Sequence, residues 1–204
     1  MKRHTIQFAI ACGVVALGAG AAISLTSCTE SAAAPDAQFS PKQLADSLNV
    51  VLKSDRKVYA RDIVTRLKNE GVITPHEEWQ ANKTLLLPAQ IFRRGAEEVD
   101  KVPEKTVEFS YSLQSKWPLN YENAMKKTPV VEEGLQFGID TNGETFYGEE
   151  TIGDQNYFIA IYPDKAVAQA CWECHNDHEN RKPDYPEFKQ GDVMGGVVIR
   201  IPID

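Results

Sequence analysis

Apolar residues recur every three or four positions between residues 39 and 70, which is the spacing of one face of an α-helix. The apolar positions are Leu44, Leu48, Val51, Leu52, Val58, Tyr59, Ile63, Val64 and Leu67. Ser40 is a favoured N-cap, Pro41 suits the first helical turn, and Gly71 suits the C-terminal stop. The pattern therefore predicts one long N-terminal helix whose apolar stripe packs against a core.

Two further helices and four strands are predicted downstream. The second helix begins at Pro88 and ends before Pro103, and the third covers residues 129–139. Apolar runs, mostly alternating with polar residues, predict strands at residues 107–113, 145–151, 156–162 and 193–203. Gly153 and Asp154 indicate a hairpin between the second and third strands. In the last strand, Gly195 and Gly196 allow a bulge or a close backbone approach.

The first 28 residues have the layout of a bacterial lipoprotein signal. Lys2 and Arg3 precede an uncharged run rich in Ala and Gly, which ends in Leu25-Thr26-Ser27-Cys28 and resembles a lipobox. This ending favours a cleaved signal peptide at residues 1–27 over a retained transmembrane helix, with lipid attached to Cys28. Residues 28–38 then form the lipidated Cys and a flexible tether, and residues 39–204 form a single domain. Thr29 after the Cys resembles the outer-membrane sorting signal, so we expect a periplasm-facing lipoprotein.

The composition supports a globular domain with an acidic surface. Hydrophobic residues make up 42% of the chain, and the formal net charge is −7. Removal of residues 1–27 takes away Lys2 and Arg3, so the charge of the remaining chain is −9. This excess of acid disfavours nucleic acid and anionic lipid headgroups as direct partners.

Two of the four cysteines remain available for chemistry in the mature domain. Cys12 leaves with the signal and Cys28 carries lipid, whereas Cys171 and Cys174 stand in a C-x-x-C-H run that ends at His175. In an exported protein this run is typical of c-type haem attachment. On one helical turn the two thiols meet the haem vinyl groups, and the adjacent imidazole is placed to ligate the iron from the proximal side.

Two other interpretations of these cysteines stay open. A redox-active pair or plain disulfide is one, although such pairs usually lie near the start of a thioredoxin-like domain. A zinc site that adds His178 and the distant His76 is the other, although no second clustered ligand pair is present.

The motif position excludes two common classes of cytochrome. Small electron-carrying cytochromes attach haem near their N-terminus and supply a Met far downstream, but only 29 residues follow His175. Four-helix-bundle cytochromes attach haem late in the chain, but the residues around this motif predict mainly strands.

A third class does fit, on motifs spread over most of residues 45–204. The motifs are Tyr59-Ala60-Arg61, Leu87-Pro88-Ala89-Gln90, Lys116-Trp117-Pro118-Leu119-Asn120, Tyr157-Phe158, the CWECH run at 171–175, Gly191-Asp192-Val193 and Ile201-Pro202. On these the chain resembles a family of c-type haem domains, many catalogued as domains of unknown function, that occur in bacterial sensors and as free-standing periplasmic proteins. The resemblance implies an α+β fold with a PAS-like antiparallel sheet, a long N-terminal helix and one covalent haem c. Unlike the sensor members, this chain shows no kinase domain, so we expect any signal to pass to a partner protein.

The second axial position of the haem would decide the function. His178 lies on the same side as His175, so we interpret it as a haem-edge or solvent residue. The candidates for the opposite side are His76, Met125, Met194 or water, and we expect an open or water-bound position, with His76 as the candidate protein ligand. Tyr157, Phe158 and Trp172 are candidates for the pocket wall, and packing in the core is the alternative for each.

Three classes of function follow from these expectations. The leading hypothesis is a lipid-anchored monohaem protein that carries electrons to a redox partner or senses redox state or a small gas, and is not an enzyme. The alternatives are a peroxide-reducing haem enzyme, or a haem-free interaction lipoprotein that uses the CxxC for a disulfide or zinc.

Overall fold

Four antiparallel strands and the helices that cover them make up the described part of the chain. The structure is a computed structural model, and it describes residues 39–124 and 126–204. The elements in chain order are α1 (Pro41–Val58), the π-helix η1 (Tyr59–Thr65), α2 (Arg66–Asn69), α3 (Trp79–Asn82), α4 (Pro88–Asp100), β1 (Ser110–Gln114), α5 (Tyr121–Ala124), α6 (Pro129–Asp140), β2 (Phe146–Ile152), β3 (Gln155–Lys165), α7 (Gln169–Asn176) and β4 (Val193–Ile203). This is the expected α+β class. The proposed signal peptide, Cys28, the tether and Met125 lie outside the described residues.

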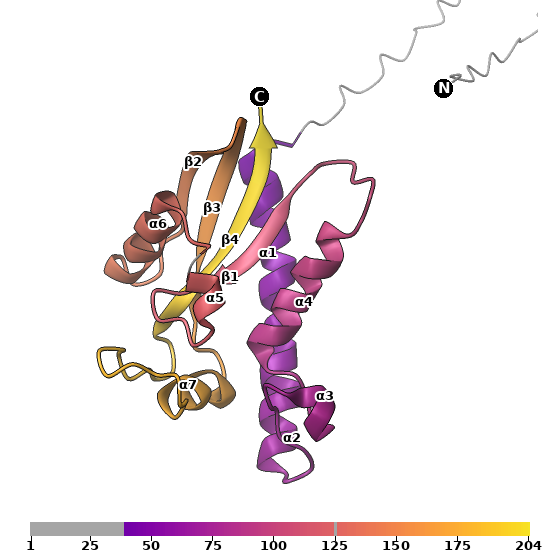
Figure 1. Ribbon diagram of the computed structural model, residues 1–204, viewed down its shortest axis with the longest axis vertical. Helices are drawn as coiled ribbons and strands as arrows, with labels where there is room; N and C mark the ends of the chain where they lie inside the picture. The colour runs from indigo at the N-terminus through magenta and orange to yellow at the C-terminus, as the bar shows by residue number, and fades with distance from the viewer. Residues whose placement is uncertain (1–38, 125) are drawn as a thin grey trace, which may run out of the picture. The chain divides into compact units, whose positions relative to one another are not determined.

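The sheet has the strand order β1-β4-β3-β2, and every neighbouring pair is antiparallel. The hairpin of β2 and β3 turns at Gly153, whose φ of +61° is readily available only to glycine. The last strand, β4, lies between β1 and β3 (Figure 1). The predicted hairpin and final strand are therefore confirmed.

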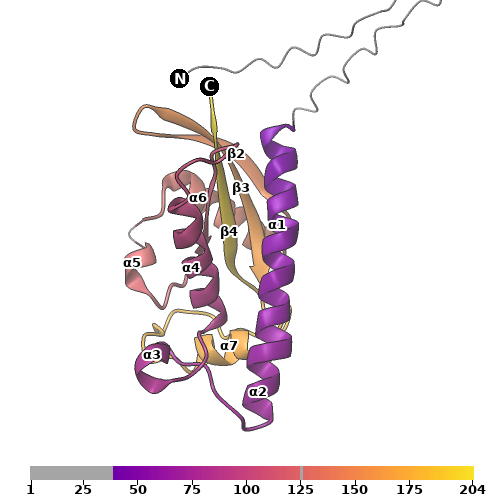
Figure 2. The ribbon, with the colours of Figure 1, turned by 90° about the vertical axis from the view of Figure 1, so that its right-hand side faces the viewer.

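Helices cover both faces of the sheet, so the central strands β3 and β4 are buried on both sides. Figure 1 shows α6 on one side of the sheet and α1 with α4 on the other, and Figure 2 looks onto the face with α1 and α4. On β3, Ile159 and Ile161 pack toward α6, whereas Ala160 and Tyr162 pack toward α1. This alternation is the two-residue period of a strand, expressed in an element that is buried on both faces.

Local signals set both ends of the long N-terminal helix. The Ser40 hydroxyl accepts a hydrogen bond from the Gln43 amide at 3.2 Å, and the Gln43 side chain accepts one from the Ser40 amide at 3.0 Å, which forms a capping box. At the other end Gly71 adopts a φ of +67°. The Gly71 and Val72 amides donate to carbonyls of the last turn in a Schellman motif, and the helix stops where predicted.

Gly195 and Gly196 allow the close backbone approach that the sequence predicts. A Cβ atom on Gly195 would lie 2.3 Å from the Gln114 carbonyl oxygen of β1, so no larger residue fits there without movement. The pairing of β3 with β4 also shifts register between Asp164 and Lys165, opposite this glycine pair. These strand ends form part of the cavity described below.

No helix in the described segments is both long and apolar enough to cross a lipid bilayer.

Candidate functional site

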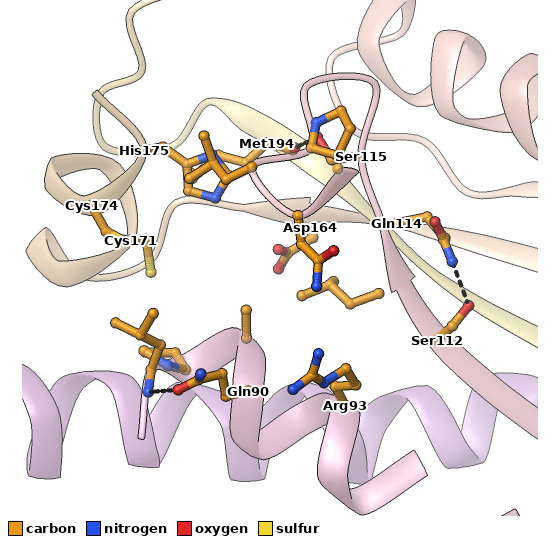
Figure 3. Close-up of a pocket in the computed structure, with 18 of the residues that line it drawn as sticks. Gln90, Arg93, Ser112, Gln114, Ser115, Asp164, Cys171, Cys174, His175 and Met194 are labelled. Atoms are coloured by element: carbon orange, nitrogen blue, oxygen red, sulfur yellow. Dashed lines mark hydrogen bonds between the residues drawn. The ribbon is translucent and has the colours of Figure 1, made fainter. Parts of the chain in front are cut away.

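Helix α7 places Cys171, Cys174 and His175 on one short segment, as expected for the C-x-x-C-H run. Both cysteines are free thiols, Cys171 buried and Cys174 half-buried. Figure 3 shows Cys171 and His175 directed toward a cavity between α7 and α4. Burial, reinforced by the charge of Glu77, raises the pKa of the Cys174 thiol, so this thiol stays protonated at neutral pH.

The π-helical segment of the first helix provides the surface on which α7 packs. Ala60 in η1 is fully buried and belongs to one apolar cluster with Cys171. The Thr65 hydroxyl donates to the Ala60 carbonyl at 2.8 Å, inside the widened turn. Lys68 of α2 adds an ion pair with Glu173 of α7 at 2.6 Å. A short π-helix is often found at functional sites, and this one lies directly under the motif helix.

His175 is held in a largely apolar environment that keeps its imidazole neutral. Its ring meets Phe188 edge to face, with centroids 5.7 Å apart, and Trp117 packs on the same Phe188 ring at 5.3 Å. The Asn176 side chain fixes Phe188 by bonding both its amide and its carbonyl, at 2.9 and 2.7 Å. Burial lowers the pKa of His175 to about 4. A neutral imidazole has a free lone pair, which is the form that ligates metal ions.

The cavity in front of α7 has a volume of about 620 Å³, within the range of about 300–1,000 Å³ that is usual for cofactor sites. Cys171, Cys174 and His175 line one wall, and residues 87–90 with Arg93 of α4 line the facing wall (Figure 3). The rest of the lining comes from the ends of β1, β3 and β4, residues 118–121, Arg56, Glu77 and Asn180.

The α4 wall is anchored by hydrogen bonds that use its polar groups. The Gln90 side chain accepts from the Leu87 amide at 3.0 Å and donates to the Glu77 carbonyl at 2.7 Å. The Tyr59 hydroxyl donates to the Leu86 carbonyl at 2.9 Å and connects this wall to the first helix. The Tyr59 and Gln90 motifs of the sequence therefore meet at the start of α4. The surface that this wall offers to the cavity is mainly apolar.

Two polar side chains of the lining have buried atoms without a hydrogen-bond partner among the described residues. Arg56 and Asp164 form an ion pair, with side chains only 14% and 13% exposed, and the Nε of Arg56 is unpaired. The Oε1 of Gln114 is also buried and unpaired. Unpaired buried polar atoms are costly, so their presence on a cavity wall indicates a bound group that carries polar atoms. Haem, which combines an apolar ring with two carboxylates, fits this lining.

The structure separates the other candidate ligands from the wall that faces His175. Met194 lines the cavity but is 6% exposed and packs with Cys171 and Phe188 on the α7 side. His76 is not among the residues that line the cavity, and its Nδ1 accepts from the Glu78 amide and lies 3.1 Å from the Asn82 side-chain amide.

His178 also lies off the cavity lining. Its Nε2 pairs with Glu77, and its Nδ1 accepts a hydrogen bond from the Asn180 amide at 3.0 Å. Across the described residues, no three His, Cys, Asp or Glu side chains gather as metal ligands. The zinc interpretation therefore lacks the ligand cluster it requires.

Two of the three aromatic candidates pack against the core. Phe158 contacts the sheet cluster under α1, Trp172 belongs to the cluster around α7, and Tyr157 stands on β3. None of the three is among the cavity-lining residues.

Sequence reasoning missed the polar part of the lining. Arg56 stands on an otherwise ordinary helix, Asp164 lies near the end of β3, and Gln114 is the last residue of β1. The one available signal was a charged residue at the end of the apolar run of β3. Nothing in the local sequence indicates that Arg56 pairs with it.

The comparisons with known proteins agree with the motif analysis. The model of the Tll0287-like family matches residues 33–202. The crystal structure of the cyanobacterial haem-protein Tll0287 is similar at 14% identity and a TM-score of 0.47, over 81% of this chain and 98% of that one. No curated protein matches the sequence. The resemblance to a haem-domain family that the motifs indicated is confirmed, because the family model covers most of the chain: the protein belongs to the Tll0287-like family.

Proposed function

We propose that this protein binds one haem c, attached through Cys171 and Cys174 and ligated by His175. The observation that carries the proposal is the C-x-x-C-H helix directed into a cavity of about 620 Å³. The family name supports it, because the protein Tll0287 is a haem-protein. The bound haem would supply a redox-active iron with an axial position for a ligand.

The chain's own residues suit these roles. His175 is neutral at neutral pH because burial lowers its pKa, so its lone pair is available to the iron. Free thiols at one wall of the cavity are the groups that form thioethers with vinyl carbons. Apolar residues of α4 on the facing wall would cover the ring.

The wall opposite His175 favours a ligand-binding haem over a bis-ligated electron carrier. Its described residues include no His, Met or Cys, and both ends of the Gln90 amide are already bonded within the protein. An axial position without a protein ligand accepts water or a small molecule, which is the property of haem sensors. We therefore propose that the protein responds to a small gas or to redox state, and passes the response to a partner protein.

The location of this activity follows from the N-terminal sequence. We propose that the lipid on Cys28 holds the domain at the periplasmic face of the membrane, in the outer membrane of a two-membrane cell. Haem attachment through thioethers agrees with export, because C-x-x-C-H motifs of this kind mature outside the cytoplasm.

Absorption spectra of the full chain, produced with a haem-ligation system, test the proposal. We expect haem that survives denaturation, and high-spin bands that shift with carbon monoxide or nitric oxide. Cys171→Ser with Cys174→Ser should lose all covalent haem. Cys28→Ser is the matched control, since it should retain haem and leave the membrane fraction.

Sharp low-spin bands would instead indicate two protein ligands and electron transfer. Turnover with peroxide would favour the enzyme, and wild-type protein without covalent haem would contradict the assignment.

A further inference from the structure

The far end of the cavity, away from the cysteines, carries polar groups that the protein itself leaves unused. Haem has its vinyl groups on one edge and its two carboxylates on the opposite edge. Thioethers at Cys171 and Cys174 would therefore direct the carboxylates away from α7. Figure 3 shows Arg93, Ser112 and Gln114 at the end of the cavity distant from Cys171.

We propose that Arg93 and Gln114 form a binding subsite for the carboxylates of the haem. This inference rests on the proposed function and adds to it the residues that orient the group and set the charge around it. The subsite joins α4 to β1, so it connects two walls of the cavity.

Arg93 is the cation of the lining that is available to a ligand. Among the described lining residues the permanent positive charges are Arg56 and Arg93, and Arg56 is buried against Asp164. Arg93 has one ion-pair contact, with Glu97 at 3.5 Å, and both side chains are about half exposed, at 46% and 51%. Such a surface pair is weak, so the planar guanidinium is free to bind a carboxylate through two hydrogen bonds. Its place on the rim leaves the carboxylates partly hydrated, which avoids the cost of burying charge.

Gln114 provides a second, neutral donor beside this cation. Its Nε2 donates to the Ser112 hydroxyl at a long 3.4 Å, while its Oε1 is buried without a partner. Rotating the amide by half a turn would direct Nε2 to the cavity and let Oε1 accept from the Ser112 hydroxyl. A hydrogen-bond acceptor in the cavity, such as a carboxylate oxygen, would then bind Nε2, and both polar atoms of the Gln114 amide would have a partner.

The test uses the full chain with covalent haem and compares Arg93→Gln with Arg94→Gln. Arg94 is the matched control, because it is the next residue of α4 and lies over the Trp79 ring at 5.7 Å rather than in the cavity lining. Arg93→Gln should shift the haem propionate bending band in the resonance Raman spectrum. It should also lower the midpoint potential, because a nearby positive charge disfavours oxidised iron. Arg94→Gln should leave the band in place and change the potential less.

Two further variants keep the inference falsifiable. Arg93→Lys should restore the potential but not the Raman band, since it retains the charge and loses the bidentate geometry. Gln114→Leu should shift the band with little change in potential. If the haem is covalently attached and neither Arg93→Gln nor Gln114→Leu moves the band, the subsite is wrong while the haem assignment stands. If the wild-type chain carries no haem, the proposed function itself fails.

Discussion

Arg56 and Asp164 form a buried ion pair in the cavity lining, and each depends on the other. Arg56 comes from the first helix and Asp164 from the end of β3, and both side chains are largely buried. Burying a charge costs folding free energy unless the charge is paired. Removing one partner of a buried ion pair therefore destabilises a protein more than removing both. The pair also lies close enough to His175 to act on its pKa, with Asp164 raising it and Arg56 lowering it.

Arg56→Gln should destabilise the fold by about 3 kcal/mol, because it leaves the Asp164 carboxylate buried without its cation. Urea unfolding at neutral pH measures this loss. The double variant Arg56→Gln with Asp164→Asn should recover a large part of it, since no isolated charge remains. Additive losses in the double variant would show that the two residues are not coupled.

At the scale of single elements, the first helix is attached to the β2–β3 hairpin through one carboxylate. Asp46 of α1 accepts hydrogen bonds from the hydroxyls of Tyr147 and Tyr162, each at 2.7 Å, and from Lys42 at 2.7 Å. Burial acts to raise the pKa of Asp46, but hydrogen bonds from Lys42, Tyr147 and Tyr162 outweigh it and hold the pKa below its usual value.

This depressed pKa makes the helix attachment sensitive to acid. The unfolded carboxyl titrates near a pKa of about 3.9, so the stabilisation is complete above that pH and is lost as the pH falls through the lower folded pKa. Asp46→Asn should cost about 1 kcal/mol at pH 7, a value kept small because the side chain is partly exposed. Urea unfolding of wild type and Asp46→Asn at several pH values should show the difference shrinking below about pH 4. Asp55→Asn, on the exposed face of the same helix, is the control, and an equal pH response in both variants would contradict the attachment.

The elements with local signals were predictable from the sequence. Ser40-Pro41 and Gly71 mark the ends of the first helix, and the last strand covers residues 193–203 as predicted. The first strand begins later than predicted, at Ser110, because pairing with β4 starts at the Ser110–Arg200 pair. Val107 lies outside it and is 46% exposed. Helices α3 and α5 have four residues each, too few to produce a periodic pattern.

The elements and contacts that depend on distant residues were not predictable. The π-helix η1 has the apolar spacing of an ordinary α-helix, so the sequence does not distinguish the two. The difference is visible only in the structure, where α7 packs against Ala60. Of the residues that line the cavity, the C-x-x-C-H run could be predicted, because its chemistry depends on local spacing. Arg56 and Asp164 stand 108 positions apart and meet only through the packing of α1 on the sheet. Local pattern therefore located the attachment point, and tertiary structure supplied the polar lining.

At the scale of the whole molecule, the described residues form three apolar clusters, and the cavity borders one of them at Cys171 and Met194 and another at Leu113. One cluster lies between the sheet and α1 with α4, a second under α6, and a third around α7 with Cys171, Phe188 and Met194. The first two clusters pack the two faces of the sheet. The α7 cluster borders the cavity, so its order depends on what fills the space between α7 and α4. We infer that haem stabilises this end of the domain most.

Haem should therefore raise the melting temperature of the protein, because the group is packed by the protein only in the folded state. Since the haem is attached covalently, its effect does not depend on a free concentration, and each 1 kcal/mol that it contributes raises the melting temperature by about 2–4 °C for a domain of this size. Thermal unfolding of wild-type chain made with and without the haem-ligation system measures the shift. Cys171→Ser with Cys174→Ser, made in both ways, is the control and should give one melting temperature. If the two wild-type preparations have the same melting temperature although only one carries haem, the stability of the domain does not depend on the haem. Hydrogen exchange should then show equal protection of the α7 amides in both preparations.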